Sequence, residues 1–132
     1  MSLRALLRPR TVVHAHCDLP CGVYDPGQAR IEALAVKACM EKYAASDDAQ
    51  LRQRAVQIKE ERANLVKQHL WVLWTDYFTP EHLTAHPQLH TLVWEATKAA
   101  GAAKNSLDVA DAQKVIDLVD RIDEVFKATN KA

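Results

Sequence analysis

Glycine and proline, the residues that most often interrupt regular structure, are almost absent from the middle of this chain. Neither occurs between Gln28 and Thr79. The whole 132-residue sequence holds 3 Gly and 5 Pro, and 6% of it is aromatic. A β-sandwich or barrel needs many turns and many aromatic or β-branched strand residues. The sequence therefore predicts an all-α fold.

Helix start signals divide the chain into four long helices. Asp25-Pro26 marks the first start, and Asp47 with Gln50 resembles the capping box of the second helix. Thr79-Pro80 opens one short helical turn, and Pro87 starts the third long helix. The predicted helices cover residues 26–44, 48–77, 87–104 and 108–129. Short connections between them favour an antiparallel up-down four-helix bundle, built as one domain.

Apolar residues recur at spacings of three and four in these helices, as expected for buried helix faces. The stripe of the second helix includes Arg62, whose guanidinium is costly to bury alone. We therefore expect Arg62 to have an ion-pair partner. The predicted stripes are Leu51, Ala55, Ile58, Arg62, Leu65 and His69; Leu89, Leu92, Val93, Ala96 and Ala100; and Val115, Leu118, Val119, Ile122, Val125 and Phe126.

One segment of the second helix is apolar around its whole circumference. It reads Leu70-Trp71-Val72-Leu73-Trp74, and such a helix is buried on more than one side. In a chain of this size, the simplest partner that could cover the second face of this helix is another subunit. We therefore expect more than one copy in the assembly, with Trp71, Trp74 and Trp94 in the core or the interface.

The total charge of the chain is balanced, but basic and acidic residues are unevenly distributed along the sequence. The 17 basic and 17 acidic residues give a formal charge of zero, so no global field favours nucleic acid or a membrane surface as partner. No apolar run is long enough to span a bilayer. Residues 1–15 nevertheless contain Arg4, Arg8 and Arg10 and no acid. The leader therefore differs chemically from the rest of the chain.

Residues 1–15 have the composition of a targeting or processing segment, and Ala15 is the small residue that cleavage sites favour. The apolar run Ala5-Leu6-Leu7 is too short for the core of a secretory signal. We expect a cytoplasmic protein in which a leader, residues 1–15, is removed from a single domain, residues 16–132. A tail without a role is the alternative.

The segment after the leader is the most distinctive chemically. It reads His16-Cys17-Asp18-Leu19-Pro20-Cys21-Gly22-Val23-Tyr24, with two thiols, an imidazole and two residues that bend the chain. A structural zinc site usually has a second ligand pair, which is absent here. A dithiol redox motif has two residues between its thiols, whereas this segment has three. A metal loop and a structural disulfide both remain open.

Cleavage after Ala15 would give this segment a further ligand. The free α-amine of His16, the amide nitrogen of Cys17 and the thiolates of Cys17 and Cys21 would make a planar N2S2 set. That geometry is typical of Ni(II) or Cu(II) and unlike tetrahedral zinc. The imidazole of His16 could occupy an axial position. On this interpretation the leader blocks the amine until it is removed.

The sequence HCDLPCGVYDP resembles the N-terminal hook of the nickel-type superoxide dismutases. The similarity continues through residues 58–62, 73–78, 89–93 and 122–126. The resemblance implies a four-helix bundle made as a precursor, processed by a peptidase and assembled as a homohexamer. It also implies a nickel cofactor and the disproportionation of superoxide to oxygen and hydrogen peroxide, with nickel cycling between Ni(II) and Ni(III).

The resemblance also implies roles for individual residues. His16, Cys17 and Cys21 correspond to the nickel ligands, and Glu32 with Arg62 would steady the imidazole of His16. The residues expected to shape the entrance to the metal, with Tyr24 also close enough to act in catalysis, are Asp18, Gly22, Val23 and Tyr24.

Two other functions use the same segment. A non-catalytic protein could bind nickel or copper at the same amine and thiolates, and a helical interaction module could carry a disulfide-closed arm. Metal content distinguishes the interaction module from the dismutase and the metal-binding protein. Catalytic loss of superoxide distinguishes the dismutase from the metal-binding protein.

Some residues depart from the pattern or suggest a second site. Cys39 is expected to be a small buried hydrophobic residue. Thr79 stands where we expect relatives to have Lys, so attraction of the anion would depend on other cations. His82, His86 and His90 recur every four residues, but Pro87 interrupts the helix, so we expect exposed or capping histidines.

Overall fold

The computed structural model describes residues 22–130, and within that range it contains helices and no strand. The long helices are α2 (Gly27–Ala44), α3 (Ala49–Val72), α5 (Leu89–Asn105) and α6 (Val109–Thr129). A π-helical turn, η1 (Leu73–Tyr77), continues α3, and the short α4 (Pro80–Ala85) precedes α5. The predicted all-α fold is confirmed.

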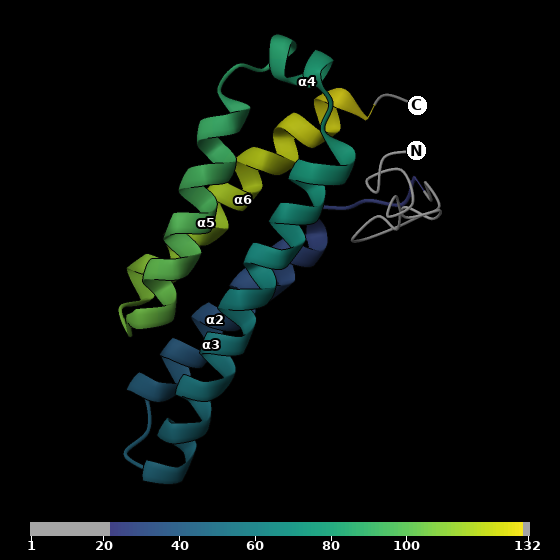
Figure 1. Ribbon diagram of the computed structural model, residues 1–132. Coiled ribbons are helices and arrows are strands. Elements are labelled where there is room, and N and C mark those ends of the chain that lie inside the picture. The colour runs from purple at the N-terminus through teal and green to yellow at the C-terminus, as the bar shows by residue number, and fades with distance from the viewer. Residues whose placement is uncertain (1–21, 131–132) are drawn as a thin grey trace, which may run out of the picture.

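The four long helices form an antiparallel bundle (Figure 1). Helix α2 packs against α3 and α6, and α5 packs against the same two helices. Each helix therefore has two neighbours, as in the predicted up-down arrangement. In Figure 1 the α2–α3 hairpin extends beyond the turn that joins α5 to α6.

The core is formed by one face of each long helix. Every stripe position predicted for α5 and α6 is buried. The face of α2 that packs inward contains the small residues Ala29 and Ala33 beside Val36 and Met40. Small side chains allow neighbouring helices to approach closely, because the distance between helix axes depends on the residues at the contact.

The buried face of α3 differs from the predicted one. Leu51 is 42% exposed, and Ile58, Arg62 and Leu65 have intermediate exposure. The prediction that places Arg62 on the inward stripe is therefore wrong, and of the six predicted positions only Ala55 is buried. Arg62 lies on the flank of α3 that faces α2. Hydrophobicity alone indicated the flank because two alanines and a lysine occupy the first three of the five positions on the true inward face. That face is Ala55, Lys59, Ala63, Val66 and Leu70.

Lys59 is the one charged residue that is buried in the described part of the chain, with 3% of its surface exposed. Its Nζ donates to the carbonyl oxygens of Ala103, at 3.2 Å, and Lys104, at 2.7 Å, and also to that of Ser106. These carbonyls lie in or just after the last turn of α5, where backbone carbonyls lack the regular helical donor. That of Ala103 also accepts from the backbone N–H of Ser106 at 3.4 Å. Lys59 thus fastens the α5–α6 turn to the middle of α3.

The helix ends confirm most start signals and correct two. Asp48, not Asp47, caps α3, because its Oδ1 accepts from the backbone N–H groups of Gln50 and Leu51 at 2.8 and 3.1 Å. Helix α5 begins at Leu89, two residues later than predicted from Pro87. The short helix α4 begins after Thr79, as predicted.

The apolar segment at residues 70–74 is only partly covered within one chain. Leu70 and Leu73 are buried, whereas Trp71 is 51% exposed. Trp94 on α5 is 59% exposed. Within residues 22–130, no helix is long and apolar enough to cross a membrane.

Candidate functional site

The described chain begins immediately after the predicted ligands. His16, Cys17, Asp18 and Cys21 lie outside the described residues. Gly22 has a φ of +67°, in the left-handed region that glycine adopts without strain. Val23 is 81% exposed, whereas Tyr24 is half-buried and packs against the core. The segment Gly22 to Tyr24 thus leads from the surface into the bundle.

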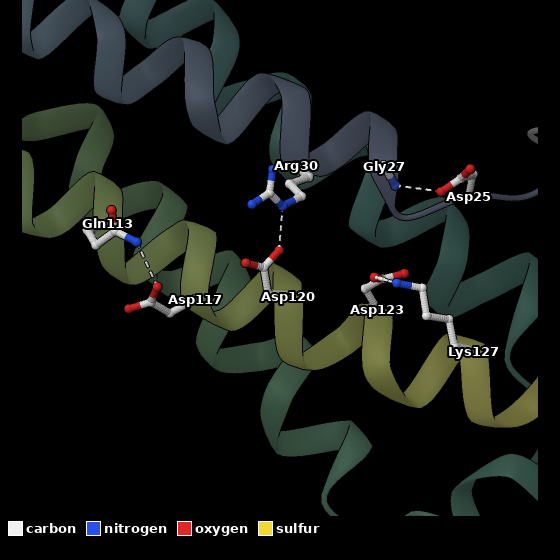
Figure 2. Close-up of polar contacts among 8 residues, drawn as sticks. All are labelled: Asp25, Gly27, Arg30, Gln113, Asp117, Asp120, Asp123 and Lys127. Atoms are coloured by element: carbon white, nitrogen blue, oxygen red, sulfur yellow. Dashed lines mark hydrogen bonds and ion pairs between the residues drawn. The ribbon is translucent and has the colours of Figure 1, made fainter.

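Two polar contacts hold the first turn of α2, one with the residue before the helix and one with α6 (Figure 2). The Oδ1 atom of Asp25 accepts from the backbone N–H of Gly27 at 2.7 Å. The Nε of Arg30 donates to Oδ1 of Asp120 on α6, also at 2.7 Å, and this carboxylate raises the pKa of Arg30. These contacts hold the start of α2 to the residue that precedes it and to α6.

Tyr24 lies beside an aromatic cluster that we call the Tyr77 cluster: Tyr77, Phe78, His82 and Phe126. The ring centroids of Tyr24 and Tyr77 are 5.7 Å apart. Tyr77 packs against Phe126, with ring centroids at 4.5 Å, and stacks on His82 at 5.6 Å. The cluster supports Tyr24 from the side of the bundle core.

The sequence indicates no functional role for Tyr77 and predicts His82 only as an exposed or capping residue. Their common location depends on η1 and α4, two short elements between α3 and α5. In η1 the backbone N–H of Phe78 donates to the carbonyl of Leu73 at 2.9 Å, a spacing of five residues, and such π-turns often occur at functional sites. No pattern in the sequence signals this turn.

A cavity of about 270 Å³ lies beside the end of the hook sequence and the start of α2. One wall is formed by residues 23–25 and Gln28, and the other by His69 and Val72 of α3 with Leu73 of η1. His69 was predicted to lie on the inward stripe of α3. It instead reaches this cavity at the end of the bundle where the hook sequence enters.

Glu32 and Arg62 form the expected ion pair between α2 and α3. The Nη1 atom of Arg62 donates to Oε2 of Glu32 at 3.2 Å and lies 3.4 Å from Oε1. The Glu32 side chain is 15% exposed and that of Arg62 is 41% exposed. The predicted pairing is confirmed, but the pair lies at the flank of the bundle and not in its core.

The remaining candidate residues do not gather into a second metal site. Cys39 is half-buried, and burial raises the pKa of its thiol. His82 accepts from the backbone N–H of Thr79 at 3.2 Å in a capping box, and His90 packs against Trp74. Among residues 22–130 there is no group of three His, Cys, Asp or Glu side chains that could hold a metal ion.

The hook sequence, His16 to Tyr24, holds the other metal-binding side chains that the sequence analysis singled out. His16, Cys17 and Cys21 can supply an amine, an amide nitrogen, an imidazole and two thiolates. Nitrogen and thiolate donors in a planar arrangement suit Ni(II), so the residues present fit this metal. These features are those of a helical-bundle metalloprotein with an N-terminal metal loop.

Comparison with known proteins gives the same result. Residues 11–130 match the family model of nickel-containing superoxide dismutase. The chain is 58% identical over 130 residues to the nickel superoxide dismutase of Streptomyces seoulensis, covering 98% of this chain and 99% of that one. The corresponding protein of Streptomyces coelicolor is 54% identical over the same shares of both chains.

A solved structure shares the fold as well as the sequence. It is a crystal structure of a nickel-containing superoxide dismutase whose nickel ligation corresponds to the oxidized state. The TM-score is 0.85 and the identity 60%, over 89% of this chain and 100% of the solved chain. This chain belongs to the nickel-containing superoxide dismutase family.

Proposed function

We propose that this protein is a nickel-dependent superoxide dismutase. The observation that carries the proposal is the family match over residues 11–130, which includes the whole hook sequence from His16 to Tyr24. In the reaction two superoxide anions and two protons give one molecule of oxygen and one of hydrogen peroxide. One superoxide is oxidised and the other is reduced, so the electrons balance over a complete cycle.

Nickel held by the amine and imidazole of His16, the amide nitrogen of Cys17 and the thiolates of Cys17 and Cys21 would supply the one-electron couple between Ni(II) and Ni(III). The electron-rich thiolates favour the higher oxidation state. The role of the protein is to create this donor set and to restrict access to it. Asp18, Gly22, Val23 and Tyr24 would shape an entrance for a small anion.

Glu32 and Arg62 would orient the imidazole of His16. Glu32 is the less exposed partner, and its carboxylate could accept a hydrogen bond from the ring while Arg62 holds the carboxylate in place. Partners of this kind set the orientation and basicity of a metal-binding imidazole. The 3.2 Å ion pair between them supports this role.

The amine ligand requires removal of residues 1–15 by a peptidase. Two coverage values support such processing. The curated relative matches 98% of this chain, whereas the complete solved chain matches only 89%. The share that has no counterpart in the solved chain is about 15 of the 132 residues, equal in length to the proposed leader.

We further propose that the protein assembles as a homohexamer in the cytoplasm. The exposed rings of Trp71 and Trp94 support assembly, since large aromatic side chains are enriched in subunit interfaces. The resemblance to the family supplies the number of copies.

The proposed activity can be tested with protein that begins at His16. With one nickel per chain it should remove superoxide at a kcat/KM within the diffusion-limited range of about 10⁸–10⁹ M⁻¹ s⁻¹ that enzymes of this class reach. Pulse radiolysis measures this rate directly. Protein that begins at Met1 and is treated with the same nickel is the control and should be inactive. Tight nickel binding without turnover would identify a metal-sequestering protein instead.

A further inference from the structure

Thr129, the last residue of α6, makes two hydrogen bonds through one hydroxyl group. Its Oγ1 donates to the carbonyl oxygen of Phe126 at 2.9 Å. The same oxygen lies 3.0 Å from the hydroxyl oxygen of Tyr77. A threonine hydroxyl carries one hydrogen, and a carbonyl oxygen can only accept. When both bonds are made, Tyr77 must therefore be the donor to Thr129.

The direction of this hydrogen bond determines whether the Tyr77 hydroxyl can donate to, or only accept from, other groups near the site. Its single hydroxyl hydrogen is used in the bond to Thr129, so its oxygen has only acceptor capacity left. The ring is held in place by Phe126 on one side and by the stacked imidazole of His82 on another. Tyr77 also lies next to Tyr24, the residue at the end of the hook sequence.

We propose that Thr129 is a positioning residue for the entrance to the site. By accepting the hydrogen of Tyr77, it keeps a phenolic O–H group from acting as a hydrogen-bond donor to anions near Tyr24. A free donor there would hold small anions and slow their exchange, whereas an acceptor oxygen does not bind them. This inference rests on the proposed location of the metal site beside Tyr24.

The hydrogen-bond direction can be measured without nickel or turnover. The intensity ratio of the tyrosine Fermi doublet in ultraviolet resonance Raman spectra is low for a phenol that donates and high for one that accepts. The difference between the nickel-free protein and its Tyr77→Phe variant isolates the signal of Tyr77. A low ratio supports the proposal, and a high ratio overturns it whether or not the protein is a dismutase.

The effect on anions can be measured in the nickel-loaded protein with azide as the probe. Thr129→Val keeps the shape of the side chain but releases the hydrogen of Tyr77, so azide should inhibit about tenfold more strongly, as expected for one hydrogen bond to a charged group. Thr129→Ser should behave as the unchanged protein. The double variant Thr129→Val, Tyr77→Phe should lose the gain, because no phenolic hydrogen remains.

Thr97 provides a matched control. Its Oγ1 donates to the carbonyl oxygens of Val93 and Trp94 within α5 and bonds to no tyrosine. Thr97→Val therefore removes the same kind of helical hydrogen bond and should leave azide inhibition unchanged. Equal azide inhibition in Thr129→Val and Thr129→Ser would overturn the proposal, as would a gain that persists without the Tyr77 hydroxyl.

Discussion

At the scale of single residues, the three cysteines lie in two different parts of the sequence. Cys17 and Cys21 belong to the hook sequence, which precedes the bundle, whereas Cys39 lies half-buried in α2. The bundle core described above is formed by residues of the helices and their connections. Changes in the hook should therefore affect metal chemistry and leave the fold intact.

We expect Cys17→Ser or Cys21→Ser to abolish superoxide dismutation, because loss of one thiolate removes a donor that stabilises the oxidised metal. Helicity measured by circular dichroism should not change. Cys39→Ser is the control and should retain both nickel and activity. Residual dismutation in either hook variant would contradict the ligand assignment.

Arg62 gives a second prediction at the same scale. Arg62→Ala should lower the free energy of unfolding by about 1 kcal/mol, since the Arg62 side chain is 41% exposed and exposed ion pairs contribute little. If the pair orients the imidazole of His16, the rate per nickel should also fall, by about 10- to 100-fold.

The control for Arg62 is the other ion pair between long helices in the described range. Arg30→Ala breaks the contact with Asp120 between α2 and α6. It should leave the rate per nickel and the axial nitrogen signal in the electron paramagnetic resonance spectrum unchanged. If Arg62→Ala behaves in the same way, the Glu32–Arg62 pair serves the scaffold alone.

At the scale of elements, Lys59 joins two halves of the bundle. Its ammonium group lies between α3 and the carbonyls at the end of α5. Burial lowers the pKa of Lys59, and the hydrogen bonds to three carbonyl oxygens offset the cost of placing a polar group there.

Lys59→Met should therefore destabilise the protein by about 2–3 kcal/mol, because the buried and partly buried carbonyls at the end of α5 lose the ammonium group as donor. Urea unfolding followed by circular dichroism measures the change. Lys98→Met, on the exposed face of α5, is the control and should have almost no effect. Equal stability of the two variants would show that water replaces Lys59 at these carbonyls.

At the scale of the whole molecule, one chain leaves large aromatic side chains in contact with solvent. Trp71 and Trp94 lie on different helices and are each more than half exposed. Soluble monomers seldom expose large apolar patches. Assembly through these side chains would bury them.

We expect sedimentation velocity at micromolar concentration to show an oligomer, and Trp71→Glu to shift it to smaller species. A charge at the centre of an interface costs far more than one at a solvated position. Leu107→Glu, which changes a 41% exposed residue within the α5–α6 turn, is the control. A stable monomer of the unchanged protein would contradict the assembly.

Much of the bundle could be predicted because it depends on local chemistry. The stripes of α5 and α6, the start of α4 after Thr79 and the pairing of Glu32 with Arg62 followed from spacing, capping residues or resemblance. The metal-binding hypothesis likewise rests on neighbouring residues, from His16 to Cys21, whose donor atoms are close in the chain itself.

Tertiary structure alone decided which face of α3 is buried, how Lys59 is satisfied and what surrounds Tyr24. The inward face of α3 is defined by helices that pack on it, and alanine or lysine at such positions carries no hydrophobic signal. The hydrogen of Tyr77 is directed by Thr129, 52 residues later in the chain. Contacts between residues so distant in sequence arise from helix packing, so no local pattern specifies them.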